Sequence, residues 1–161
     1  KESESEDSYN KRAAQEHRHF VLDKELVRLK GQTPFEACDL LSADGHMMHV
    51  KRKSRSAALS HLAAQALNST LLLRSDSKVR QAVCGAITNT GSTLKQSDQA
   101  TMRSHIESFG GQITASVDIV VVGLWRGQPR LDQLPLLTRV NLHSWVHQMP
   151  CQRSIILVGQ A

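Results

Sequence analysis

The stretch that decides the fold is residues 33–65, which reads TPFEACDLLSADGHMMHVKRKSRSAALSHLAAQ. Two apolar runs lie on either side of Asp44-Gly45, a dipeptide typical of tight hairpin turns. From Ser56 onward, apolar residues recur at helical spacing. The pattern therefore predicts a β-hairpin, residues 35–42 with residues 46–53, followed by a helix that packs on it.

The length of the hairpin loop sets which residues face each other. Residues 43–45 fit a three-residue type I turn that is closed by a left-handed glycine. In that register Asp39 faces His49, and Lys51 lies two residues further along on the same side of the sheet. A two-residue Asp-Gly turn would pair Asp39 with Val50 instead. We favour the first register because it gathers the polar residues on one face.

The rest of the chain alternates between helical and strand patterns. Helices are expected from 8 to 17, 56 to 71, 77 to 89, 97 to 109 and 136 to 149, with a strand over 82–88 as the alternative within the third. Strands are expected over 20–22, 26–29, 117–125 and 154–158, and a loop over 127–135. Residues 1–7 form an acidic start that we expect to be disordered. The alternation predicts one α/β domain over residues 8–161, with a mixed central sheet, a β-hairpin at its core and flanking helices.

Composition describes an ordinary soluble globular protein: 161 residues, 40% apolar and 22% charged. No apolar run approaches the about 20 residues that span a bilayer, and the acidic N-terminus lacks the apolar core of a signal peptide. Three widely spaced cysteines in apolar contexts are typical of free thiols, so we expect a cytoplasmic protein. Because the chain starts at Lys1 rather than Met, we interpret it as a fragment of a longer protein.

A cluster of basic residues follows the second strand of the hairpin. Lys51, Arg52, Lys53 and Arg55 lie within five positions of a chain whose formal net charge is +5. Such a cluster beside a candidate site indicates a polyanionic partner. An ordinary solvated surface is the alternative interpretation of the same charges.

The polar residues of the hairpin suit the hydrolysis of a phosphodiester. A carboxylate and a second ligand bind Mg²⁺ or Mn²⁺, which polarises the phosphate and lowers the pKa of water. A nearby lysine orients or deprotonates the nucleophile, or stabilises charge in the transition state. Asp39, His49 and Lys51 supply these groups. Each also has a structural interpretation: a strand-blunting acid, a core histidine and a solvated strand end.

The order Asp39, tight hairpin, His49-Val50-Lys51 and a helix that carries Gln65 resembles the core of the restriction-endonuclease-like superfamily. The pattern of that superfamily is Asp, a gap, then Asp/Glu-x-Lys, often with a glutamine on the following helix. The resemblance implies that Asp39 and His49 bind metal, Lys51 is catalytic and Gln65 organises the site. His49 stands where the superfamily has an acid; histidine favours Mn²⁺, Zn²⁺ or Ni²⁺ over Mg²⁺. Glu36 is the alternative acid, and it reaches the site only through a bulge.

A closer resemblance covers nearly the whole chain. It is carried by 8–10, 21–24, 35–41, 49–52 and 59–65, and by Leu134-Pro135 with Val140-Asn141-Leu142. These segments are similar to the C-terminal region of a sporadically distributed bacterial family of unknown function with suspected roles in phage defence. The missing N-terminal region of the same protein is then an expected partner.

We therefore expect a metal-dependent nuclease of bacterial genome or phage defence, acting on DNA more readily than on RNA. Arg52, Lys53, Arg55 and His61 are the expected nucleic-acid contacts. The apolar face of residues 136–149 is a candidate homodimer contact. The alternatives are a catalytically inactive nucleic-acid-binding module of the same fold and a protein-interaction domain of a larger defence protein.

Overall fold

The computed structural model describes residues 4–23, 26–28, 34–54, 56–90, 95–111 and 116–159. Its helices are α1 (Glu6–His17), α2 (Ser56–Ser75), α3 (Ser77–Thr90), α4 (Gln96–Ser108), the short 3-10 helix η1 (Leu131–Gln133) and α5 (Leu136–Gln148). Its strands are β1 (Phe20–Val21), β2 (Leu26–Val27), β3 (Phe35–Glu36), β4 (Leu40–Leu41), β5 (His46–Arg52), β6 (Ser116–Gly123) and β7 (Gln152–Gly159).

The central sheet has five strands in the order β1-β4-β5-β6-β7, so the predicted mixed α/β class is confirmed. The first three strands are antiparallel, and β5, β6 and β7 are parallel. Helix α2 begins the crossover from β5 to β6, which a parallel pair requires. All eight residues of β6 are buried, as expected for the central strand of a sheet that is covered on both faces.

The predicted hairpin register is confirmed where both strands are regular. Leu40 pairs with Met48 and Leu41 with Met47. The Ser42 N–H donates to the His46 carbonyl at 2.9 Å, and Gly45 closes the turn with φ +88°. A Cβ on Gly45 would also overlap the His105 ring, so the turn requires glycine for two reasons.

The first strand of the hairpin is shorter than predicted. Residues 35–42 divide into β3, which pairs with β2 in a separate two-stranded sheet, and β4, which belongs to the main sheet. Between them Ala37 and Cys38 are buried in the core, at 2% and 1% exposure. Both side chains belong to the same apolar core cluster, whereas successive residues of a regular strand point to opposite faces of the sheet.

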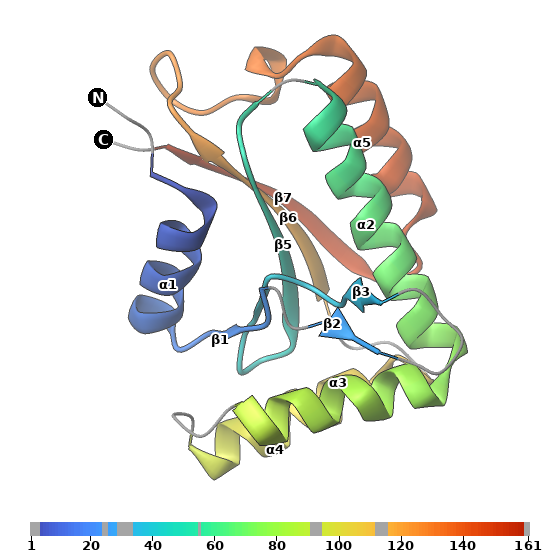
Figure 1. Ribbon diagram of the computed structural model, residues 1–161. Coiled ribbons are helices and arrows are strands. Elements are labelled where there is room, and N and C mark those ends of the chain that lie inside the picture. Colours follow the sequence, from blue (N-terminus) through green and yellow to red (C-terminus); the bar gives the residue numbers. More distant parts are fainter. Residues whose placement is uncertain are drawn as a thin grey trace.

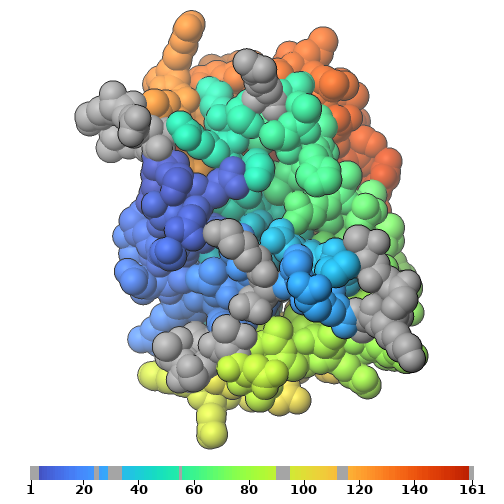
Figure 2. Space-filling model, viewed as in Figure 1, coloured from blue at the N-terminus to red at the C-terminus, as the bar shows by residue number. Residues whose placement is uncertain are grey.

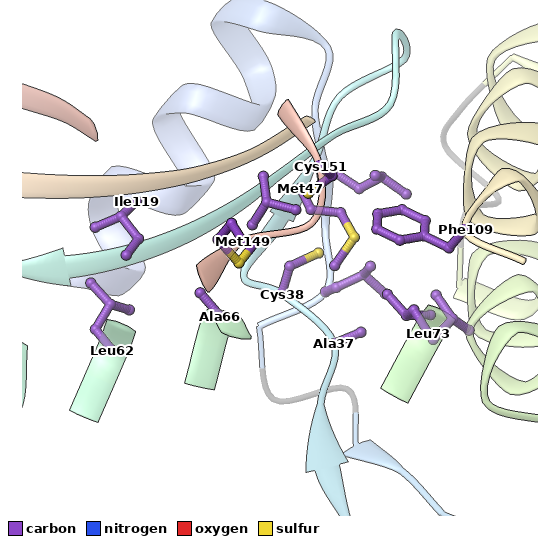
Figure 3. Packing of buried hydrophobic residues seen from close by; sticks show 14 of the residues in the cluster. Ala37, Cys38, Met47, Leu62, Ala66, Leu73, Phe109, Ile119, Met149 and Cys151 are labelled. Carbon is purple, nitrogen blue, oxygen red and sulfur yellow. The ribbon is translucent and has the colours of Figure 1, made fainter. Parts of the chain in front are cut away.

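Helices cover both faces of the sheet (Figure 1). Helix α1 packs on one face over a small apolar layer that includes Ala13, Leu40 and Val50. Helices α2 and α5 cover the other face, and α3 and α4 close one end of it. In this larger core Leu62 of α2 points at Ile119 of β6, and Met47 lies between Cys38 and the Phe109 ring (Figure 3).

Two boundary predictions were wrong. Helix α1 is capped by Ser5, whose hydroxyl accepts the Ser8 N–H at 3.1 Å, so Ser8 is not the cap. The predicted disordered start therefore does not include Glu6 and Asp7, and residues 1–3 lie outside the described ranges. The alternative strand over 82–88 is also wrong, because α3 is helical throughout.

The three cysteines are free and buried, as the sequence predicted. Burial raises the pKa of the Cys84 and Cys151 thiols to about 11, so neither is a reactive thiolate near neutral pH. Within the described ranges no helix is long and apolar enough to cross a membrane. Leu136, Leu137 and Val140 of α5 are exposed, so the homodimer contact stays a prediction.

Candidate functional site

Asp39 lies immediately before β4 begins, and its side chain continues the hydrogen-bonding of the strand. The ladder stops at Leu40, so Asp39 does not face His49 as the sequence predicted. Instead a carboxylate oxygen of Asp39 accepts the Val50 N–H at 2.8 Å. Its backbone carbonyl accepts the N–H groups of Leu22 and Asp23 at 2.8 and 3.1 Å. Asp39 is therefore held rigidly at both its backbone and its side chain.

The surroundings of Asp39 disfavour its charged form. Burial is the largest cause that raises the pKa of this carboxyl, to about 7. The Val50 N–H lowers the pKa, the acids Asp23 and Glu36 raise it, and Lys51 lowers it. A carboxyl that titrates near neutral pH in a partly closed position is typical of functional sites.

The amine of Lys51 is bound by an acid that the sequence analysis missed. Glu6, in the first turn of α1, accepts a hydrogen bond from the Lys51 amine at 2.8 Å. The other carboxylate oxygen of Glu6 accepts the Arg52 N–H at 3.1 Å. Figure 2 shows the start of α1, in dark blue, in direct contact with the segment around the end of β5, in teal. The helical spacing of Glu6 with Asn10 and Ala13, which are both buried, was the available signal for its orientation toward the sheet.

Two carboxylates thus bind the edge of β5 that β4 leaves unpaired. Val50 and Arg52 are two residues apart, so their N–H groups point in the same direction and lie roughly 7 Å from each other. Asp39 binds the first and Glu6 the second. Lys51 lies between them in sequence, and its amine reaches Glu6. These bonds satisfy an exposed strand edge, and they also bring two carboxylates and a lysine to one short segment.

His49 does not belong to this group, which corrects the sequence prediction. Its ring is fully buried, and neither ring nitrogen has a hydrogen-bond partner among the described residues. Burial lowers the pKa of His49 to about 4, so the ring is neutral. Side chains alternate along β5, and the closed core lies on the side that His49 shares with Met47. The structure therefore places His49 as a core residue.

Glu36, Gln65 and His61 line a different cavity, of about 490 Å³, between β3 and α2. The Gln65 amide donates to the Glu36 carboxylate at 3.3 Å. Ser69 donates to the Glu36 carbonyl at 3.0 Å, which fixes β3 against the helix. Gln65 is thus placed beside Glu36 rather than at Lys51. The charge of Glu36 also raises the pKa of Asp39.

The residues of the basic cluster differ in their surroundings. Arg52 is exposed, whereas Lys53 donates to the Leu124 carbonyl at 3.2 Å and lies 4.2 Å from the centre of the Trp125 ring. Lys53 therefore anchors the loop after β6 through these two contacts. Arg55 lies outside the described residues. The same loop carries the exposed residues Arg126 and Arg130, of which Arg130 forms an ion pair with Asp132 at 2.7 Å.

The acidic groups at this strand end supply oxygen atoms, the kind of ligand that hard divalent cations take. Mg²⁺ is usually held by one or two carboxylates and keeps several waters, and Mn²⁺ also accepts oxygen ligands. Asp39 and Glu6 supply two carboxylates on neighbouring N–H groups of β5. Within the described part of the chain no three or more His, Cys, Asp or Glu side chains form a group that could hold a metal ion.

Comparison with known proteins assigns a family to the chain but no activity. The model of one protein family matches residues 1–154, and that family is described as one of unknown function, DUF6119. The chain belongs to this family. No curated protein and no solved structure matches it.

Proposed function

For this member of DUF6119 we propose a metal-dependent nucleic-acid phosphodiesterase with a restriction-endonuclease-like core, acting in bacterial genome or phage defence. One observation carries the proposal. Asp39, Glu6 and Lys51 are brought together along residues 50–52 of β5 by three hydrogen bonds of 2.8–3.1 Å. Two oxygen ligands beside a lysine are the groups that phosphodiester hydrolysis requires.

The topology supports the proposal. A helix is followed by antiparallel strands β1, β4 and β5, then by a helical crossover to the parallel strand β6. This is the order that the resemblance to restriction-endonuclease-like proteins implies. The candidate groups lie at the ends of β4 and β5 in that order, which agrees with Asp39 and Lys51 as the two motif positions.

The proposal takes Glu6 as the second acid. The acid expected two residues before the lysine is His49, which is buried, and Glu6 from α1 takes its place beside Lys51. Asp39 and Glu6 would hold the cation, which when bound supplies Lewis acidity to the phosphate. Lys51 carries a positive charge at 2.8 Å from Glu6 and would stabilise negative charge as it develops on the phosphate. Gln65 would act indirectly, by holding Glu36 near Asp39.

We expect Lys51→Ala and Glu6→Gln to lower cleavage of DNA at least about 100-fold in Mg²⁺ or Mn²⁺, because each removes a charge from the reacting centre. The rate is measured on plasmid, linear duplex, single-stranded DNA and RNA. Lys11→Ala is the matched control, since Lys11 forms a 2.8 Å pair with Asp7 on the exposed face of the same helix. Cleavage that is absent from the wild type, or that survives Lys51→Ala, would contradict the nuclease proposal.

The second candidate function is nucleic-acid binding without cleavage, and the exposed cations at the end of β5 favour it. We expect the affinity for duplex DNA to fall with salt at a log–log slope of about 0.9 per phosphate contacted. Replacing Arg52, Arg126 and Arg130 with alanine should flatten that slope and weaken binding to all sequences alike. Fluorescence anisotropy at several salt concentrations measures both effects.

The control for the binding experiment is Arg74→Ala. Arg74 is an exposed arginine in the last turn of α2, about 30 Å from the first turn of that helix. Equal losses from Arg74→Ala and from the triple variant would show that general positive charge, and not this surface, binds the nucleic acid.

A further inference from the structure

The cavity of about 490 Å³ between β3 and α2 has no ligand in the proposed chemistry. Strand β3, with β2 paired to it, lies beside α2 (Figure 1). Cavities of this size hold small organic ligands, and they are usually lined by apolar side chains with a few polar groups that fix the ligand. This cavity has both kinds of residue. Its apolar lining is Leu26, Pro34, Phe35, Ala64 and Leu72, and its polar lining includes Glu36, Gln65 and Asn68.

The polar groups of the cavity are held in place by hydrogen bonds. The Gln65 amide nitrogen donates to the Glu36 carboxylate at 3.3 Å, which directs the amide oxygen of Gln65 away from that carboxylate. The Ser69 hydroxyl contacts the carbonyl oxygens of Glu36 and Gln65 at 3.0 and 2.9 Å, so it joins β3 to the helix. Asn68 is exposed three residues after Gln65, and residues at this spacing are neighbours on a helix surface. The cavity therefore combines a carboxylate with two amides before any ligand binds.

The apolar lining suits a flat aromatic ligand. Phe35 and Leu72 are half-buried and pack against the main core, so the core fixes the position of both side chains. Leu26 is 43% exposed, although it belongs to a strand. A ligand in the cavity would cover part of this exposed apolar surface. Nucleobases that leave a duplex bind in this way, between aromatic or apolar side chains and with hydrogen bonds to the edge of the base.

The cavity lies close to the candidate site for phosphodiester hydrolysis. Glu36 and Asp39 are three residues apart, so their Cα atoms are separated by at most about 11 Å. The charge of Glu36 also raises the pKa of Asp39, as expected for two neighbouring carboxyls. A base in the cavity and a phosphate at Asp39 can therefore belong to adjoining nucleotides of one strand.

We propose that this cavity binds an unpaired adenine or cytosine base of the substrate strand, next to the phosphate at Asp39 and Lys51. The inference rests on the proposed function and specifies the substrate class of the same site. Adenine and cytosine carry an exocyclic amino group, which donates to the Glu36 carboxylate, and the amide of Asn68 or Gln65 binds the neighbouring atoms of the base edge. Uracil, thymine and hypoxanthine present a carbonyl oxygen at the same position, which a carboxylate repels.

The test compares nucleosides in which a carbonyl oxygen replaces the amino group. Adenosine is compared with inosine, and cytidine with uridine, by NMR titration in metal-free buffer, so that no cleavage contributes to the result. We expect the wild type to bind each amino-bearing nucleoside at least about 10-fold more tightly than its carbonyl counterpart.

Two variants test the lining of the cavity. Glu36→Gln keeps the size of the side chain but adds a donor, so it should reduce the preference for adenosine over inosine to less than about threefold. Asn68→Ala should weaken adenosine binding about 10-fold, and an exposed helical position tolerates alanine well. Gln148→Ala is the matched control, because Gln148 is an exposed amide that lines a separate cavity between α2 and α5. This control should bind adenosine as the wild type does.

The outcomes separate this inference from the proposed function. If the wild type binds adenosine and inosine equally, or binds no nucleoside, the inference is overturned, while cleavage by the site of Asp39, Glu6 and Lys51 is judged by its own assay. Unchanged binding by both Glu36→Gln and Asn68→Ala also overturns it, because the base then binds elsewhere. If nucleosides bind as expected but no nucleic acid is cleaved, the cavity is a base site of a binding module and the nuclease proposal fails.

Discussion

Asp39→Asn is expected to abolish cleavage and to stabilise the protein at the same time. The substitution removes the negative charge of a proposed cation ligand, and we expect the cleavage rate to fall at least about 100-fold. It also removes a carboxyl whose buried position raises its pKa from 3.8 to about 7. Asparagine keeps an oxygen that accepts the Val50 N–H, so the packing at the start of β4 is preserved.

The stabilisation by Asp39→Asn has a defined pH dependence. Because the folded pKa lies above the unfolded value, the folded protein retains a proton that the unfolded chain loses between about pH 4 and pH 7. The wild type therefore loses stability as the pH rises through that window. The advantage of the variant should grow from near zero at pH 4 to at most about 4 kcal/mol at pH 8. Urea unfolding in metal-free buffer at both pH values measures it.

The matched control for Asp39→Asn is Asp76→Asn. The Asp76 carboxylate accepts the Lys78 N–H at 2.8 Å at the junction of α2 and α3, so it makes the same kind of bond away from the site. Asp76→Asn should not change cleavage, because this carboxylate caps the start of α3 and is not part of the proposed site. If Asp39→Asn cleaves at the wild-type rate, Asp39 is a structural residue. If that variant is less stable than the wild type at pH 8, the charged form of Asp39 supports the fold instead.

His49 is expected to make the protein sensitive to acid. Its folded pKa of about 4 lies below the ordinary value of 6.5, because burial disfavours the charged ring. Between about pH 6.5 and pH 4 the unfolded chain therefore binds a proton that the folded protein does not bind. Above that window His49 does not lower the free energy of unfolding. As the pH falls through the window, the free energy of unfolding decreases by about 3 kcal/mol in total because of this residue.

His49→Leu should remove this acid sensitivity and leave cleavage unchanged. Leucine is close to histidine in size and leaves no unsatisfied nitrogen in the core, so the variant should be more stable at every pH. The free energy of unfolding of both proteins is compared at pH 7, 6, 5 and 4, together with the cleavage rate at pH 7. If the variant folds as stably as expected but no longer cleaves, His49 is a ligand of the site and not only a core residue.

The sequence by itself determined most of the secondary structure and the register of the hairpin next to its turn. Apolar periodicity identified α2, α3, α4 and α5 within a few residues, because each buries one stripe against a common core. The Asp44-Gly45 turn sets the pairing of Leu40 with Met48, because few residues other than glycine adopt φ +88°. These features depend on local geometry, so a short window of sequence contains them.

Only the tertiary structure decided how the candidate site is composed. Asp39 and Lys51 were identified from their spacing, but which acid stands beside Lys51 depends on how α1 docks, and Glu6 is 45 residues away from it in the chain. Alternation along β5 placed His49 and Lys51 on one face of the sheet. At His49 this face is covered by the core, and it is open to solvent only at the end of the strand, near Lys51. Burial and long-range pairing are properties of the assembled sheet and helices, which no local pattern of residues encodes.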